Sequence, residues 1–266
     1  NAPGSHIAIE HGFTGFNLTF TQRESSALSA VAFAAAQIVK GSAAAAIAGG
    51  VEEINEMTFS VLDRIGALAH RRGELDECPR PFDRDRNGMG VGEGAAMFRL
   101  MRDENVVEPR WGYLSGFAIA RDPSASISDW GSGADHVVRA MRGALDDAGV
   151  ELGEIDAIWA SANGTRRGDR LEATAIDRLF AGMEIPPVVA TKGYFGEYAA
   201  AGALHLASAL VALREQRLFA SLGFRHPDAG ARFAPTTRDE QRSLRHLLIN
   251  SLSAGGGIVS AVLSRP

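Results

Sequence analysis

The sequence predicts an α/β fold with a largely parallel sheet, and two observations lead to this prediction. Segments typical of buried strands alternate with segments typical of helices along the 266 residues. Two alanine-rich helical segments, 25–40 and 198–216, each follow a strand and a polar turn and precede a further apolar segment. This internal pseudo-repeat favours two similar halves, packed as a layered α/β/α/β/α arrangement.

The first half is predicted to contain a strand, a sharp turn and a buried helix. Residues 18–21 favour β structure, and the helix at 25–40 is apolar over most of its surface. Gly41 ends this helix, and the short apolar run 43–48 is typical of a buried strand. The remaining elements expected here are a helix within 57–68, a loop at 79–88 and a strand at 94–101.

A polar connector at 103–110 separates the halves, so we place them at residues 1–104 and 111–266. The clearest helix of the second half is 133–148, whose apolar residues fall on one face. The Gly-rich turn 253–257 predicts an antiparallel pair formed by the apolar runs 246–251 and 258–263. The other elements expected are strands at 111–120, 155–160, 188–191 and 217–224 and a helix at 171–180.

Composition excludes several classes of function. The net charge is −5, and no Lys/Arg cluster has the density of a nucleic-acid footprint, so we expect no nucleic-acid partner. No apolar run is long enough to span a membrane. The single cysteine, Cys78, excludes an internal disulfide and a Cys-based metal site and fits a reducing, cytoplasmic location. The chain begins in mid-pattern, so we expect the N-terminal part of the first half to be absent from it.

The turn at 22–26 is the first candidate for chemistry. A strand-to-helix elbow presents one side chain beside the free N–H groups of a helix start, a common place for a nucleophile or an oxyanion hole. This elbow presents Glu24. Elsewhere, Asp83, Asp85 and Glu93 look like a metal-binding cluster.

Four segments resemble one family in the same order along the chain: RPFDRDRNGMGVGEGA at 80–95, NGTRRGDRLE at 163–172, TKGYFGE at 191–197 and NSLSAGGG at 250–257. They resemble the β-ketoacyl synthases, condensing enzymes of fatty-acid and polyketide assembly that have the thiolase fold. Within this family the chain is similar to the Cys-less ketosynthase β, or chain length factor, subunits of type II polyketide synthases.

The resemblance implies where the catalytic groups would lie. The family's acyl-carrying Cys falls on Glu24, and its two His residues, which stabilise an enolate, fall on Asn163 and Glu197. Lys192 is retained. The family's phenylalanine gate falls near Ala254, which with Gly255 and Gly256 is the expected substrate-contacting turn. The acidic cluster is structural in the family, so the resemblance implies neither a metal nor a cofactor.

These substitutions imply that the chemistry has been removed. A carboxylate at Glu24 cannot carry an acyl chain as a thioester does, and an ionised Glu197 would repel the enolate. The resemblance therefore implies a catalytically silent subunit that pairs with an active ketosynthase and serves chains carried by an acyl carrier protein. The alternative is an active β-ketoacyl-ACP synthase or malonyl-ACP decarboxylase with unusual residues. We further expect a Glu24–Lys192 ion pair, and a strand at 17–21 that pairs across the dimer.

Overall fold

The computed structural model of the chain describes residues 2–73, 76–105 and 110–266. Its main sheet has five strands in the order β3-β9-β8-β4-β5. The pairings β3/β9 and β9/β8 are antiparallel, whereas β8/β4 and β4/β5 are parallel. The strands of this sheet are β3 (Tyr113–Arg121), β4 (Ala157–Trp159), β5 (Val188–Val189), β8 (His246–Leu252) and β9 (Gly257–Ser264).

The sheet is therefore mixed rather than largely parallel as predicted. The predicted antiparallel pair at 246–263 is confirmed, because β8 and β9 form a hairpin from His246↔Ser264 to Leu252↔Ile258. Strand β3 adds to the outer edge of this hairpin in antiparallel register. The strands that alternate with helices, β4 and β5, supply the parallel part.

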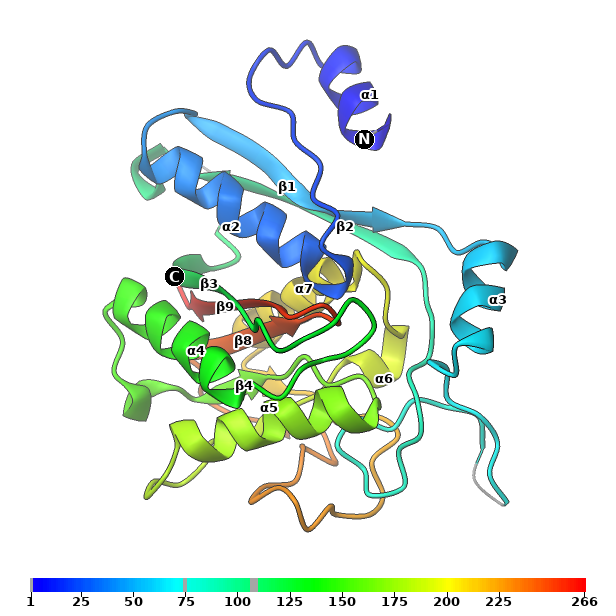
Figure 1. The fold of residues 1–266 in the computed structure, drawn as a ribbon. Helices are drawn as coiled ribbons and strands as arrows, with labels where there is room; N and C mark the ends of the chain where they lie inside the picture. The colour runs from blue at the N-terminus through cyan, green and yellow to red at the C-terminus, as the bar shows by residue number, and fades with distance from the viewer. Residues whose placement is uncertain (1, 74–75, 106–109) are drawn as a thin grey trace.

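Helices cover both faces of this sheet (Figure 1). One face packs on α4 (Ala134–Ala148) and α5 (Arg166–Leu179), around a core that includes Val137, Met141 and Ile176. The other face packs on α2 (Ser26–Val39) and α7 (Ala201–Glu215), around a core that includes Leu28, Trp159 and Leu213. The two alanine-rich helices contact each other, as their small side chains allow.

A second, two-stranded sheet lies on the far side of α2 and α7 (Figure 1). It pairs β1 (Ala45–Glu52) with β2 (Gly94–Met101) in antiparallel register. The described layers are thus α4/α5, the main sheet, α2/α7 and the small sheet, four of the five layers predicted. Residues Leu28 and Val31 of the first predicted half share a core with Ile249 of the second, and the division at 104/111 stays a prediction. Residues 106–109 of the predicted connector lie outside the described residues.

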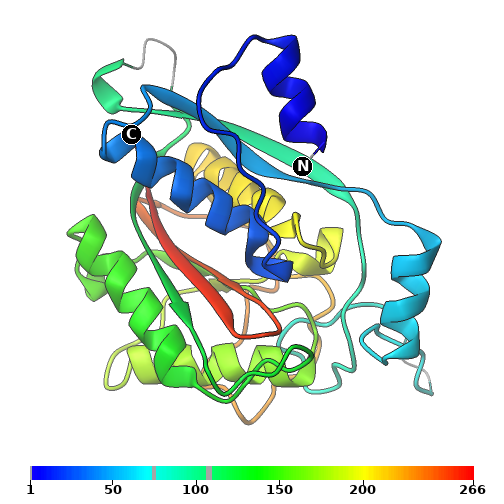
Figure 2. The ribbon, with the colours of Figure 1, turned by 45° about the horizontal axis from the view of Figure 1, so that its top comes forward.

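The first half differs from the sequence prediction in two places. No strand forms at 18–21, because the described chain offers no neighbouring strand whose backbone could pair with it. Helix α1 (Ala2–Glu10) was not predicted; it buries none of its residues and stands apart from the body in Figure 2. Helix α3 (Glu56–Arg64) begins one residue before its predicted range of 57–68 and likewise has no buried residue.

In the second half, α5 begins five residues before the predicted start at 171, and the strand predicted at 217–224 is reduced to β6. The polar first turn of α5, Arg166 to Gly168, has the composition of a loop, which hides the helix start. The short elements are η1 (Arg23–Ser25), η2 (Asp103–Asn105), η3 (Leu152–Glu154), α6 (Lys192–Phe195), β6 (Arg217–Leu218) and β7 (Glu240–Gln241).

No helix among the described residues combines the length and hydropathy needed to cross a bilayer.

Candidate functional site

The elbow places Glu24 in η1, directly before α2. Arg23, the preceding residue, has a φ of 54°, a left-handed conformation that costs a non-glycine residue about 1 kcal/mol or more. The Glu24 side chain is buried, and its Oε2 accepts a hydrogen bond from the backbone N–H of Ala254 at 3.1 Å. The structure therefore brings together two positions that are 230 residues apart in the chain.

Lys192, Glu197 and Asn163 form a second buried group. Lys192 is the first residue of α6, and Gly196, with a φ of 76°, reverses the chain so that Glu197 returns toward it. The Lys192 ammonium forms an ion pair with Glu197 Oε2, which also accepts from Asn163 Nδ2 at 2.9 Å. The predicted Glu24–Lys192 pair is thus wrong, because Glu197 lies within one turn of Lys192 and takes its charge.

Burial raises the pKa of Glu197 from 4.5 to about 7. Lys192 opposes this shift by favouring the carboxylate, whereas the negative charge of Glu24 adds to it. All three side chains are almost inaccessible to solvent. The site is therefore a compact set of two carboxylates and one ammonium, in which the charge of Glu197 depends on Lys192.

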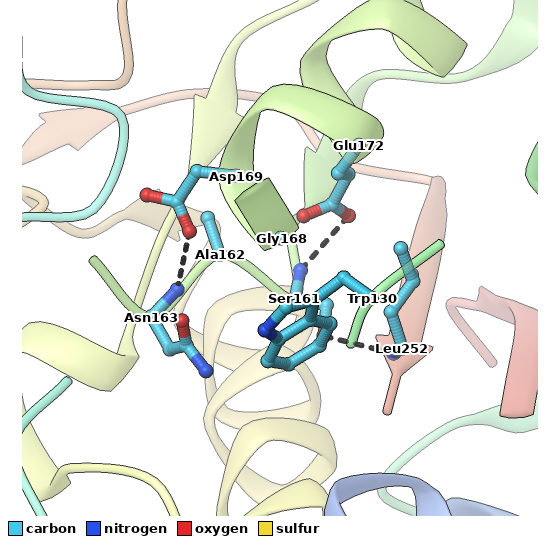
Figure 3. A pocket seen from close by; sticks show the side chains of 8 residues that line it. All are labelled: Trp130, Ser161, Ala162, Asn163, Gly168, Asp169, Glu172 and Leu252. Carbon is cyan, nitrogen blue, oxygen red and sulfur yellow. Dashed lines mark hydrogen bonds between the residues drawn. The ribbon is translucent and has the colours of Figure 1, made fainter. Parts of the chain in front are cut away.

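Sequence reasoning missed Ser161, which follows strand β4 and joins this group. Its Oγ accepts from Leu252 N–H at 2.9 Å and from Lys192 Nζ at 3.4 Å, and its N–H donates to Glu172 Oε1 at 2.9 Å. Figure 3 shows the hydrogen bonds that join Ser161 to Glu172 and to Leu252. Position at the carboxyl end of a parallel strand, where α/β sites commonly lie, is the signal that points to this residue.

Glu172 is a buried carboxylate that is only half satisfied. Oε1 accepts from Ser161 N–H and from Asn250 Nδ2 at 3.0 Å, but Oε2 has no partner among the described residues. Burial raises the pKa of Glu172 from 4.5 to about 7, so part of the population is a neutral acid at neutral pH. A protonated Oε2 carries a smaller desolvation penalty than a buried anion.

Asp169 holds the surrounding turns in place. Its carboxylate accepts the backbone N–H groups of Phe82, Asn163 and Gly164 at 2.7 to 3.2 Å, although burial raises its pKa to about 6. Gly164 has a φ of 93°, and a Cβ there would lie 2.6 Å from the carbonyl oxygen of Gly88. The long loop at 79–88 is therefore fixed against the site, as part of its wall.

The backbone of the turn at 254–256 is hydrogen-bonded to the loop between β3 and α4. Gly255 N–H donates to Asp129 O at 2.9 Å, and Gly256 O accepts from Asp122 N–H at 2.8 Å. The expected substrate contacts of Ala254, Gly255 and Gly256 stay predictions.

Of the acidic residues that resemble a metal site, Asp83 and Asp85 lie beside His226, with ligand atoms within 4.8 Å of one another. Glu93 instead accepts the N–H of Ile54 at 3.1 Å. Asp83 accepts three backbone N–H groups, including those of Arg225 and His226 at 2.6 Å. Its carboxylate therefore has a structural role: it links the loop at 79–88 to the backbone at residues 225–226.

Comparison with known proteins identifies the family. The sequence profile of the β-ketoacyl synthase N-terminal domain matches residues 1–105, and that of the C-terminal domain matches residues 111–225. The chain belongs to the β-ketoacyl synthase family. The assignment of Glu24, Asn163 and Glu197 to the family's catalytic positions stays a prediction.

Similar β-ketoacyl synthases come from distant organisms. The chain is 30% identical to a putative mitochondrial 3-oxoacyl-[acyl-carrier-protein] synthase of Schizosaccharomyces pombe, over 96% of this chain and 63% of that protein. It is 28% identical to 3-oxoacyl-[acyl-carrier-protein] synthase 2 of Coxiella burnetii, over 100% of this chain and 66% of that protein. The chain thus spans less than two thirds of the length of these relatives.

Solved β-ketoacyl synthase structures match the whole described architecture. The ishigamide ketosynthase/chain length factor aligns with a TM-score of 0.91 at 27% identity, over 99% of this chain and 64% of that one. A β-ketoacyl synthase from Burkholderia phymatum aligns with a TM-score of 0.89 at 26% identity, over 98% and 64%. A type II polyketide ketosynthase in complex with its acyl carrier protein aligns at 0.93, but at 20% identity this match shows the fold alone. The predicted thiolase-like α/β fold is confirmed.

Proposed function

We propose that this chain is a catalytically silent ketosynthase-like subunit of the chain length factor type. It pairs with an active ketosynthase and shapes the tunnel in which an acyl chain, carried by an acyl carrier protein, is extended. The observation that carries the proposal is the elbow: its side chain is the carboxylate of Glu24, and that carboxylate is buried and bound within the protein.

The elbow presents a carboxylate in place of a nucleophile, and this carboxylate occupies one backbone donor. A thiol there would hold the acyl chain as a thioester, whereas an acyl carboxylate at Glu24 would be a readily hydrolysed mixed anhydride. The backbone N–H of Ala254 could serve as an oxyanion donor only if it were free, but it donates to Glu24 Oε2 at 3.1 Å. The chain's single cysteine, Cys78, lies in the loop region between α3 and β2 and is absent from the elbow.

The second group opposes enolate chemistry. A decarboxylating malonyl thioester needs donors beside its oxygen, and here Asn163 and Lys192 both donate to Glu197 instead. An ionised Glu197 adds a negative charge where the enolate would form, and like charges this close are strongly unfavourable in a dry site. Neither condensation nor decarboxylation is supported by this arrangement.

The N-terminal segment supports a protein partner. None of the backbone N–H groups of residues 14–21 donates to another described residue. The large apolar side chains Phe13 and Leu18 are 51% and 57% exposed. An extended segment with unpaired backbone and exposed apolar side chains is suited to pairing with a strand of another chain, here the proposed ketosynthase.

The test is to incubate the purified chain with radiolabelled malonyl-acyl carrier protein, alone and with a candidate partner ketosynthase. The proposal expects neither labelled CO₂ nor condensed product from the chain alone, and a stable complex that changes the product lengths made by the partner. The names of the curated relatives favour the alternative, an active synthase. Product or CO₂ formed by the chain alone, and lost in a Lys192→Met variant, would establish that alternative.

A further inference from the structure

A groove at the β5 edge of the main sheet lies outside the site described above. It is open to solvent, and its volume of about 490 Å³ is within the range of small-molecule sites in proteins. Residues 184–187, residues 232–234 and Arg242 line it. Residues 184–187 lead into β5, whereas Lys192 follows the carboxyl end of that strand. The groove and the Lys192 group therefore belong to opposite ends of β5.

Backbone hydrogen bonds to the sheet hold both walls of the groove. On one side Pro187 O accepts from Ile158 N–H of β4 at 2.9 Å. On the other side Pro235, next to the lining segment, forms a parallel bridge with Val188, and Thr236 N–H donates to Val188 O at 2.8 Å. The groove is therefore preformed, and a ligand need not order its walls on binding.

Arg232 supplies one cation to the groove. Its Nη2 donates to Met183 O at 3.1 Å, and its Nη1 donates to Asp177 O in the last turn of α5 at 3.3 Å. Its backbone N–H donates to the Asp177 carboxylate at 3.2 Å. The partners of the guanidinium group among the described residues are carbonyl oxygens, so this group is fixed in place without an ion pair to a carboxylate.

Arg242 supplies a second cation, which can turn toward a ligand. Its Nη1 lies 3.6 Å from Glu240 Oε1, and both side chains are more than 40% exposed, so this pair contributes little to stability. The Arg242 backbone is held, because its N–H donates to Gln216 O at 2.8 Å. Glu184 is the one acidic residue among those that line the groove, so two guanidinium groups face one carboxylate.

Half-buried apolar side chains complete the lining of the groove: Ile185, Pro186, Pro187 and Phe233. The ring of Phe233 packs edge-to-face on the buried Phe82, with 5.1 Å between the centroids, and is thereby fixed. The prolines fix the φ angles of their segment. The groove therefore offers an apolar contact surface as well as its two cations.

We propose that this groove binds a small phosphate monoester. The guanidinium groups of Arg232 and Arg242 hold the phosphate, and the apolar side chains contact the organic part of the ligand. Guanidinium groups bind phosphate oxygens through paired, charge-assisted hydrogen bonds, and a dianion matches two cations. A carboxylate ligand carries a single negative charge and would leave one of these cations uncompensated. Glu184 opposes an anion in the groove, so neutralising it should strengthen binding.

Titration of the purified chain with phenyl phosphate, followed by amide chemical shifts in NMR spectra, tests the site. Shifts should appear at residues 184–185 and 233–234, with half-saturation at about 1 mM. Inorganic phosphate, which lacks the ring, and benzoate, which lacks the second charge, should each bind several-fold more weakly. Arg242→Ala should weaken binding by about tenfold, and Glu184→Gln should strengthen it about twofold. Arg242 is chosen because Arg232 also caps α5.

The matched control is Arg178→Ala, which removes an exposed arginine of α5 that binds Asp135 and does not line the groove. This variant should leave binding unchanged. Absence of shifts at ten times the expected half-saturation, unchanged binding by Arg242→Ala, or equal binding of inorganic phosphate and phenyl phosphate overturns the proposal. The malonyl assay concerns the Lys192 end of β5 and this titration the other end, so the two proposals can fail separately.

Discussion

Replacement of Lys192 by Met tests the ion pair at the centre of the site. Lys192 and Glu197 are both 1% exposed, so the variant leaves a buried carboxylate with only Asn163 Nδ2 and its neighbour's backbone N–H, from Tyr198, as donors. Removing one partner of a buried pair costs about 3–5 kcal/mol. For a chain of this length that corresponds to a fall in melting temperature of ~10 °C.

The loss should depend on pH in a direction that the pKa of Glu197 fixes. Because that pKa is raised from 4.5 to about 7, the stability linked to the bound proton is fully present below 4.5 and is lost as pH rises through 7. Without Lys192 the pKa rises further, so the uncompensated carboxylate continues to destabilise at higher pH. The difference between wild type and Lys192→Met should therefore be larger at pH 8 than at pH 5.

Thermal and urea unfolding at both pH values, followed by circular dichroism, measure this difference. The double variant Lys192→Met/Glu197→Gln has no charge in the pair and should recover much of the lost stability. Glu24→Gln is the comparison variant: Glu24 makes no ion pair with Lys192, and its charge adds to the raised pKa of Glu197, so this variant should not reproduce the larger loss at pH 8. Unchanged melting of Lys192→Met at pH 8, or a double variant no more stable than the single one, would refute the reasoning.

Three further predictions concern the same region. Glu24→Cys should gain no condensing activity with radiolabelled malonyl-acyl carrier protein, because Glu197 still opposes the enolate; product above the background of the parent chain would contradict this. Glu172→Gln should remove a loss of about 3 kcal/mol that the wild type shows in urea unfolding between pH 5 and 8, because the pKa of Glu172 is raised from 4.5 to about 7 by burial. Tyr198→Phe should unfold at the same temperature or up to a few degrees higher, since the buried Tyr198 hydroxyl has no partner among the described residues; marked destabilisation would show a bond that the structure does not contain.

Local pattern was enough to predict the elements that carry their own signal. The helix at 133–148 has one apolar face, and the hairpin of β8 and β9 has a glycine turn between two apolar runs; both formed where expected. The prediction of a strand at 18–21 was wrong, because a strand needs a neighbouring strand to pair with and β propensity alone does not supply one. Helix α1 is the opposite case, a helix that forms although the sequence did not predict it. Pro3 and Gly4 lower the helix propensity of this segment, and none of its residues is buried, so it has no apolar face that could have indicated a helix.

The sequence indicated which positions form the candidate site, but not which of these side chains pair with one another. Motif positions identified Glu24, Asn163, Lys192, Glu197 and Ala254, and the structure brings them into two adjoining groups. The partner of Lys192 depends on the reversal at Gly196, a backbone conformation that the sequence alone does not specify. Ser161 was missed because a serine after a strand carries no signal until the strands that surround it are placed.

The way the polar groups pair supports the proposed silent subunit over a site built to receive a substrate. A catalytic centre keeps donors aimed at the place where charge develops, so some of them are unpaired before the substrate binds. Here the N–H of Ala254 is taken by Glu24, and the ammonium of Lys192 and the amide of Asn163 are both taken by Glu197. A substrate oxygen would have to displace a buried carboxylate from each donor, and desolvating that carboxylate without its partner is strongly unfavourable. Under the proposed function, the same pairs that hold the fold together around the elbow would oppose catalysis there.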